Sequence, residues 1–178
     1  MRRSTTLLGS LAVAAAMIGA TALPASAAAG DTSTTFSLSG GSLSSSVQST
    51  ATLTGASTAV GSTVITGPLG AVTVTDDRGG TAVWTVSAVS AVFTGALITS
   101  PSSSTAVSYT GGAVSTTGTI TVISGAATTL DPTTPAAVVS PSALSGNNTA
   151  SWTPTLDVTM PAGAKADTYT GIVTTSVA

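Results

Sequence analysis

The stretch VTVTDDRGGTAVWTVSAV, residues 72–89, decides the fold class of this chain. Valine and threonine alternate in its first part, and apolar residues return at every second position from Trp84 onward. A period of two is typical of a strand with one buried face, and Asp and Gly residues between such runs are typical of turns. The stretch therefore predicts two β-strands joined by a hairpin turn at residues 76–80. It also predicts that Trp84 packs inward against Val74.

The same period of two recurs through the rest of the chain, separated by Gly and Pro residues. No stretch after Pro24 repeats its apolar residues with the 3.6-residue period of a helix. The composition, rich in Thr, Ser, Val, Ala and Gly, also favours strands and turns. We therefore expect an all-β fold, an antiparallel β-sandwich in a single domain. Further runs with this period are Phe36 and Leu38; Ile120 and Val122; Leu156, Val158 and Met160; and Tyr169, Gly171 and Val173.

Three segments are expected to lie outside strands or at their ends. Residues 124–148, rich in Pro, Gly and Asn, read as a long exposed connection. Asn147-Asn148-Thr149 matches a glycosylation pattern, but this match is common in a Thr-rich chain and better indicates a turn. Residues 162–165 form an expected solvent-facing turn. Pro154 indicates a strand that begins there or lies at a sheet edge.

The first 27 residues have the three parts of a secretory signal peptide. Arg2 and Arg3 are followed by the apolar run Leu7–Leu23, and Ala25-Ser26-Ala27 is a small-x-small cleavage pattern. A membrane anchor is the competing interpretation, but a spanning helix needs about 20 apolar residues. We therefore expect a signal peptide at 1–27, a domain at 28–178, and a secreted or extracellular protein. We expect neither a covalent nor a membrane anchor after cleavage, because the sequence after Tyr169 holds no apolar span or sorting motif.

Composition excludes several classes of function. Beyond the signal segment the only cations are Arg78 and Lys165, against six aspartates in the whole chain, so binding to nucleic acid or to an anionic lipid surface is not expected. The chain has no Cys, so it has neither a disulfide nor a thiolate metal site. Because His and Glu are also absent, the usual general bases are missing and we expect no enzyme and no cofactor. A Ca²⁺ site at Asp76 and Asp77 stays open, although such a pair also suits a turn.

The few aromatic residues allow two interpretations. They fill the widest gaps of a sandwich core, or an exposed ring among them offers a stacking surface for a carbohydrate. The residues are Phe36, Trp84, Phe93, Tyr109, Trp152 and Tyr169.

Three segments in this order resemble the WxL domain of Gram-positive surface proteins, in particular the small WxL-like proteins of actinobacteria. They are GGSLSSSVQSTATL at 40–53, GPLGAVTVTDDRGGTAVWTVSAVSAVFTG at 67–95 and NNTASWTPTLDVTMPAGAKADTYTGIVTTSVA at 147–178. The most specific part is the Thr-Asp-x-Arg-Gly turn at 75–79 followed by Trp84-Thr85-Val86. The resemblance implies an extracellular all-β domain that attaches non-covalently to the cell wall, with peptidoglycan or another wall glycan as ligand. The residues it implicates in attachment are Asp76, Asp77, Arg78, Gly79, Trp84, Val86 and Tyr169.

The chain departs from the family pattern at both of its Trp-x-Leu motifs. In the first motif, Val86 stands where leucine is expected. In the second, Thr175 holds the tryptophan position and Val177 the leucine position. Trp152 lies elsewhere and does not replace the missing tryptophan.

The sequence thus predicts a non-catalytic secreted protein that associates with the cell wall through a WxL-like domain. A second prediction is a structural or adhesive subunit that associates with itself, or with other surface proteins, through Thr- and Val-rich edge strands.

Overall fold

The computed structural model describes residues 33–54, 64–96 and 103–178, which form strands and connections without a helix. Every strand lies in one compact unit, Leu38–Ala178, whereas the residues up to Ser37 belong to a separate unit. All strand pairs are antiparallel. The expected all-β antiparallel fold is therefore confirmed. Within the described ranges, no helix is long and apolar enough to cross a bilayer.

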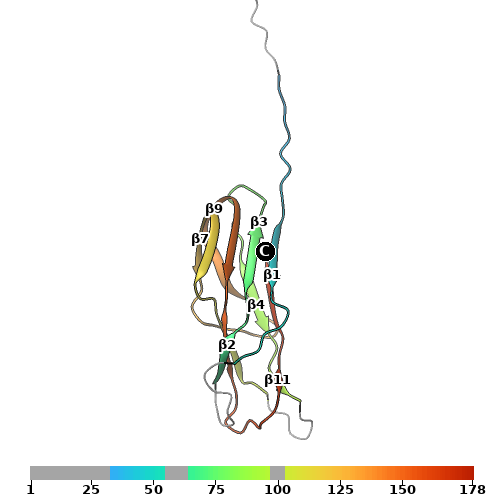
Figure 1. The fold of residues 1–178 in the computed structure, drawn as a ribbon, viewed down its shortest axis with the longest axis vertical. Coiled ribbons are helices and arrows are strands. Elements are labelled where there is room, and N and C mark those ends of the chain that lie inside the picture. The colour runs from blue at the N-terminus through green and yellow to red at the C-terminus, as the bar shows by residue number, and fades with distance from the viewer. Residues whose placement is uncertain (1–32, 55–63, 97–102) are drawn as a thin grey trace, which may run out of the picture. The chain divides into compact units, whose positions relative to one another are not determined.

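The strands fall into three sheets (Figure 1). Their bounds are β1 Leu43–Val47, β2 Val64–Pro68, β3 Val72–Asp76, β4 Val86–Ser90, β5 Thr94–Gly95, β6 Ala106–Thr110, β7 Val114–Ser124, β8 Thr128–Thr129, β9 Ala136–Trp152, β10 Thr155–Thr159, β11 Tyr169–Thr170 and β12 Val173–Val177.

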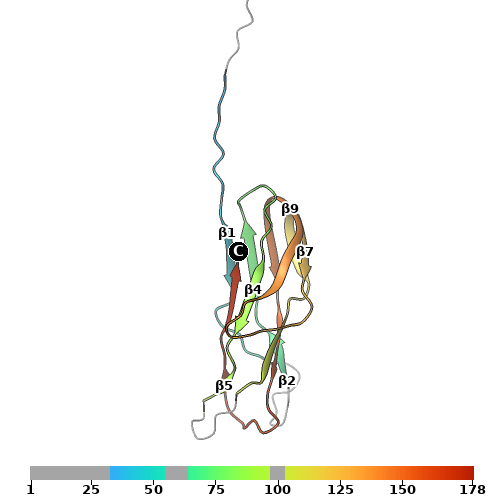
Figure 2. The ribbon, with the colours of Figure 1, turned by 180° about the vertical axis from the view of Figure 1, so that it is seen from behind.

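The largest sheet has the order β1-β3-β9-β4-β12, with β7 also paired to β9. The long strand β9 arches over at one end of the compact unit, as Figures 1 and 2 show, and β7 follows it. Gly146 in β9 and Gly118 in β7 lie where the register between these two strands shifts. Their φ values of 71° and 89° fall in the left-handed region that favours glycine. The arch turns one sheet into two facing layers, one with β1 and β3 and the other with β4 and β12.

The two smaller sheets extend these layers. The sheet β2-β10-β6-β8 continues the first layer, because β2 leads into β3, β10 follows β9 and β6 leads into β7. The pair β11-β5 continues the second layer, because β5 follows β4 and β11 precedes β12. Together the layers make a sandwich whose core runs through all three sheets.

The core confirms the period-two patterns of the central strands. Strands β3 and β4 alternate between buried and half-buried positions, as expected for sheet faces that pack on one another. Trp84 and Val74 belong to one buried cluster. Its other members are Val72, Val86, Ala88, Val107, Tyr109, Leu130, Val138, Val139, Leu144, Ala150, Trp152, Leu156, Val158 and Met160.

The predicted hairpin within residues 72–89 is wrong. Strands β3 and β4 do not pair with each other, and both pair with β9, Val72 opposite Trp152 and Val86 opposite Val139. Residues 77–85 instead pass from one layer to the other (Figure 1). This connection is longer than the two to five residues of most hairpin loops, and β9 is long enough to pair with both strands.

The predicted long connection at 124–148 is also wrong, because it contains β8 and most of β9. Its Pro and Gly residues sit where the strand is irregular rather than where it stops. Pro141 lies opposite Val122 beside a register shift, a position where a missing N–H is tolerated. Gly146 lies between Ser145 and Thr149, where the register between β9 and β7 shifts, and it has a positive φ.

The structure also decides three further expectations. Phe36 and Leu38 lie in no strand, and their exposed fractions are 84% and 88%, so the strand predicted there is wrong. Pro154 directly precedes β10, so the expectation that a strand begins there is confirmed. The alternative, an edge strand, is wrong, because β10 lies between β2 and β6. The turn at 162–165 is confirmed by the hydrogen bond from Ala164 N to Pro161 O.

Candidate functional site

The residues that carry the family resemblance meet at the corner where the chain leaves β3. Asp76 closes β3 with a 2% exposed side chain. The Arg78 guanidinium donates from Nε to Asp76 Oδ1 and from Nη2 to Oδ2, both at 2.9 Å, and Arg78 N donates to Oδ1 at 3.1 Å. Arg78 Nη2 also donates to Ala82 O. This fork of charge-assisted bonds fixes the start of the connection between the layers.

The ion pair shifts the pKa values of both partners apart. The side-chain hydrogen bonds from Arg78 hold the pKa of Asp76 below its ordinary value, although burial opposes this shift. The same bonds raise the pKa of Arg78. The pair is therefore charged at neutral pH, and both carboxylate oxygens of Asp76 are engaged by arginine.

The rest of the corner is shaped by glycines and backbone contacts. Asp77 is exposed, and its backbone exchanges hydrogen bonds with Gly41 and Ser42. A Cβ at Gly41 would lie 2.5 Å from Asp77 Cβ, so the approach of these two segments requires glycine. Gly79 has φ of 70°, which completes the turn, and the following Gly80 accepts a hydrogen bond from Gly146 N at the arch of β9.

Trp84 is a core residue rather than an exposed platform. Only 2% of it is exposed, and it precedes β4 at the end of the connection between the layers. Its Nε1 is buried without a hydrogen-bond partner. Val86, also buried, pairs with Val177 on one side and Val139 on the other. Trp84 and Val86 are therefore core residues, and their buried side chains are not accessible to a glycan.

Tyr169 lies apart from this corner, on β11, whose partner is β5 (Figure 1). Its ring is half-buried against the core, and its hydroxyl donates to Lys165 O at 2.8 Å. The sequence motif residues are thus not one site, because the structure gathers the residues at 76–86 and leaves Tyr169 elsewhere.

The other aromatic residues, with one exception, are also buried or half-buried. Tyr109 and Trp152 are buried, and Phe93 is half-buried against the core, as the packing interpretation expects. Phe36 is the exception, because its ring is exposed.

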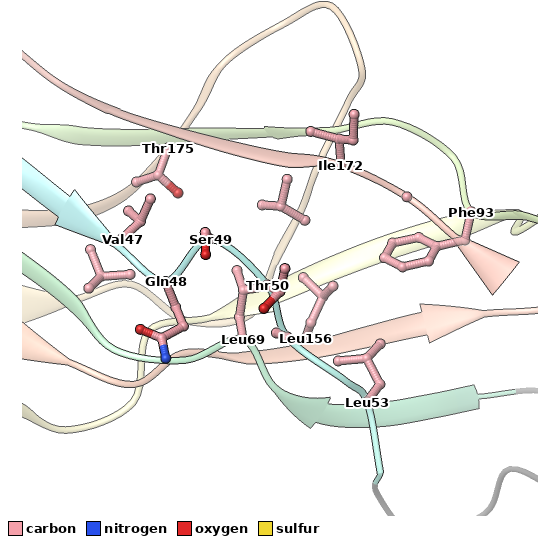
Figure 3. Close-up of a pocket in the computed structure, with 14 residues that line it drawn as sticks. Val47, Gln48, Ser49, Thr50, Leu53, Leu69, Phe93, Leu156, Ile172 and Thr175 are labelled. Atoms are coloured by element: carbon pink, nitrogen blue, oxygen red, sulfur yellow. The ribbon is translucent and has the colours of Figure 1, made fainter. Parts of the chain in front are cut away.

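A pocket of about 280 Å³ opens beside β1 and β12, and we call it the seam pocket (Figure 3). Leu156, which is fully buried, and Val72 belong to its lining. Val47 and Ile172 line it as well, with exposed fractions of 49% and 73%. None of its lining residues is charged. A space with these walls suits a neutral, apolar group.

Thr175, at the position where the resemblance places a tryptophan, also lines the seam pocket (Figure 3). It is half-buried on β12 and pairs with Ala88 of β4. Its side chain is small, so it fills little of the pocket.

The seam pocket is not visible in the sequence because its walls come from segments far apart in the chain. One local signal exists. Ile172 is a large apolar residue placed between Gly171 and Val173, out of phase with the two-residue period that runs from Tyr169.

No group of three or more His, Cys, Asp or Glu side chains that could hold a metal ion occurs in ranges 33–54, 64–96 and 103–178. Asp76 is engaged by Arg78, which favours an ion pair over a Ca²⁺ site there. Comparison with known proteins finds no matching family model, no matching curated protein and no matching solved structure.

Proposed function

We propose that this chain is a non-catalytic, exported surface protein that associates non-covalently with the bacterial cell wall, with peptidoglycan or another wall glycan as its ligand. The resemblance to WxL domains is the origin of this proposal. Among its most specific residues, Asp76 and Arg78 form an ion pair where the connection between the layers starts, and Trp84 is buried where that connection ends. They therefore fix the two ends of this connection.

The observation that carries the proposal is the surface of β7. Ser115, Thr116, Thr117, Thr119 and Thr121 are exposed along this strand, and β9 is its only partner among the described strands. Each hydroxyl both donates and accepts hydrogen bonds, which suits a neutral sugar. Because the tryptophans are buried, a contact with glycan rests on such hydroxyls rather than on ring stacking.

The test is co-sedimentation of residues 28–178 with purified Gram-positive cell walls at low and high salt. We expect a bound fraction that changes little with salt, since an association between ions would weaken steeply. Replacing Thr116, Thr117 and Thr119 with Val removes hydroxyls while keeping β-branched side chains, and should reduce binding. The matched control replaces the exposed Thr153 and Thr155 with Val. If the protein sediments with cell walls at neither salt concentration, wall association is refuted.

A second candidate function is a structural or adhesive subunit that associates with itself. The specific observation in its favour is that large apolar side chains are exposed while the uncharged seam pocket is open. Exposed apolar surface of this kind marks interaction sites in soluble proteins. Sedimentation velocity of residues 28–178 over a range of concentrations separates a self-associating protein from a monomer.

A further inference from the structure

The largest sheet is nearly closed, and its two end strands face each other across a seam. Strands β1 and β12 lie side by side in both views (Figures 1 and 2). Each pairs on one side only, β1 with β3 and β12 with β4, in the part of the chain that the structure describes. The two edges face each other at a distance shorter than the two spacings of about 4.8 Å that an inserted strand needs, so a partner contacts this seam from outside, through side chains.

The seam pocket adds side-chain specificity to this edge. Val47 of β1 and Thr175 of β12 both line it, so the pocket is continuous with the seam (Figure 3). Its lining is uncharged, and Ile172 and Val47 expose apolar surface beside it. An occupant that suits this pocket is uncharged, outside any strand pairing and able to insert an apolar side chain.

The chain contains a peptide with these three properties. Residues 33–39, STTFSLS, are uncharged and belong to no strand. Phe36 and Leu38 are two residues apart, so in an extended peptide they point to the same side. They have the highest exposed fractions of the large apolar residues described, 84% and 88%.

We propose that residues 33–39 of a second copy dock across the mouth of the seam pocket, with Phe36 or Leu38 inserted in it. This inference rests on the second candidate function, self-association. Because the peptide and the pocket are different surfaces, a reciprocal exchange closes a dimer, and a one-way contact builds rings or open chains of molecules.

The first test compares association constants from sedimentation velocity of residues 28–178. F36S/L38S removes the apolar side chains of the peptide, and V47S/I172S removes those beside the pocket. We expect the association constant of each double variant to be at least about tenfold lower than that of wild type, because loss of one buried apolar side chain has an effect of this size. V83S/I123S, which alters exposed apolar residues elsewhere, is the matched control and should associate like wild type.

A mixing experiment distinguishes this contact from other interfaces. F36S/L38S keeps an intact seam, and V47S/I172S keeps an intact peptide. Mixed together they should form complexes that stop at one copy of each, because neither variant can extend the chain at its altered surface. A synthetic STTFSLS peptide should also block assembly of wild type.

The outcomes separate this inference from the function on which it rests. If wild type associates and F36S/L38S associates equally well, the docking proposal fails while self-association stands. If wild type stays monomeric at all concentrations, both fail. F36S/L38S is decisive even if V47S/I172S folds poorly, because Phe36 and Leu38 are exposed in the structure.

Discussion

Trp152 donates its indole N–H to the hydroxyl of Tyr109 at a distance of 2.9 Å, with both side chains buried. The bond joins the last residue of β9, in the largest sheet, to β6, in the four-stranded sheet. Burial raises the pKa of Tyr109, although the bond from Trp152 opposes the shift. One polar contact within the core thus fixes the position where one sheet continues into the next.

Replacing Tyr109 with Phe should lower the free energy of unfolding by about 1–3 kcal/mol, because it leaves the buried Trp152 N–H without a partner. Urea unfolding followed by circular dichroism measures this loss. The matched control is Tyr169→Phe, whose hydroxyl bonds an exposed carbonyl and should cost at most about 0.5 kcal/mol. Equal losses in the two variants would contradict the account.

The Asp76–Arg78 pair should make stability depend on pH below 4. The pKa of Asp76 is lowered in the folded protein from its ordinary value of 3.8, so the ionised form stabilises the fold. This contribution is complete above about pH 4 and is lost as the pH falls below 3.8 towards the folded pKa. Wild type should therefore exceed Asp76→Asn in stability at neutral pH, and the difference should shrink between about pH 4 and pH 2.

Asp131 titrates in the same range, because hydrogen bonds from Thr133 and Thr134 lower its pKa. Both proteins contain it, so its effect cancels in the comparison. A difference between wild type and Asp76→Asn that did not change with pH would show that the ion pair does not stabilise the fold.

Two glycines at the arch offer a matched pair of substitutions. Gly118 and Gly146 both have positive φ, so alanine at either position costs about 1–2 kcal/mol of backbone strain. A Cβ at Gly118 would also lie 2.5 Å from Asn147 O, whereas nothing lies within 4 Å at Gly146. Gly118→Ala should therefore cost about 2–4 kcal/mol, clearly more than Gly146→Ala. The reverse order in denaturant unfolding would mean that the arch is built differently.

Trp84→Ala should lower the free energy of unfolding by about 3–5 kcal/mol, the usual cost of removing a large aromatic residue from a core. Trp84→Phe should cost less, because it keeps a ring and removes an N–H that has no hydrogen-bond partner. Val83→Ala is the control, since Val83 is exposed. A loss below about 1 kcal/mol for Trp84→Ala would favour the stacking interpretation that the structure rejects.

The sequence predicted what depends on local periodicity and composition. The alternation around Val74, Trp84 and Leu156 was enough to give the all-β class and part of the core. Pairing was not predictable in this way, because β9 reaches both β3 and β4 across long separations in the chain. Pro141 and Gly146 resemble loop residues in composition, yet they accommodate a bulge and an arch within β9.

The candidate site was predictable only in part, for the same reason. The turn at Asp76 and Arg78 is local, so its residues were found together. The seam pocket joins Val47, Leu156 and Thr175, whose proximity follows from the topology of the sandwich and not from any spacing in the chain. The exposure of Phe36 was likewise invisible to a pattern of alternating residues.

The central claim is that both tryptophans hold the core and that contacts with partners are made by neutral groups elsewhere. Acrylamide quenching of tryptophan fluorescence tests it most directly, because the chain has two tryptophans, Trp84 and Trp152, both buried. We predict weak quenching in the folded protein, strong quenching after unfolding in urea, and no change in either on addition of solubilised peptidoglycan fragments. A folded protein with a readily quenched tryptophan that such fragments protect would contradict the account.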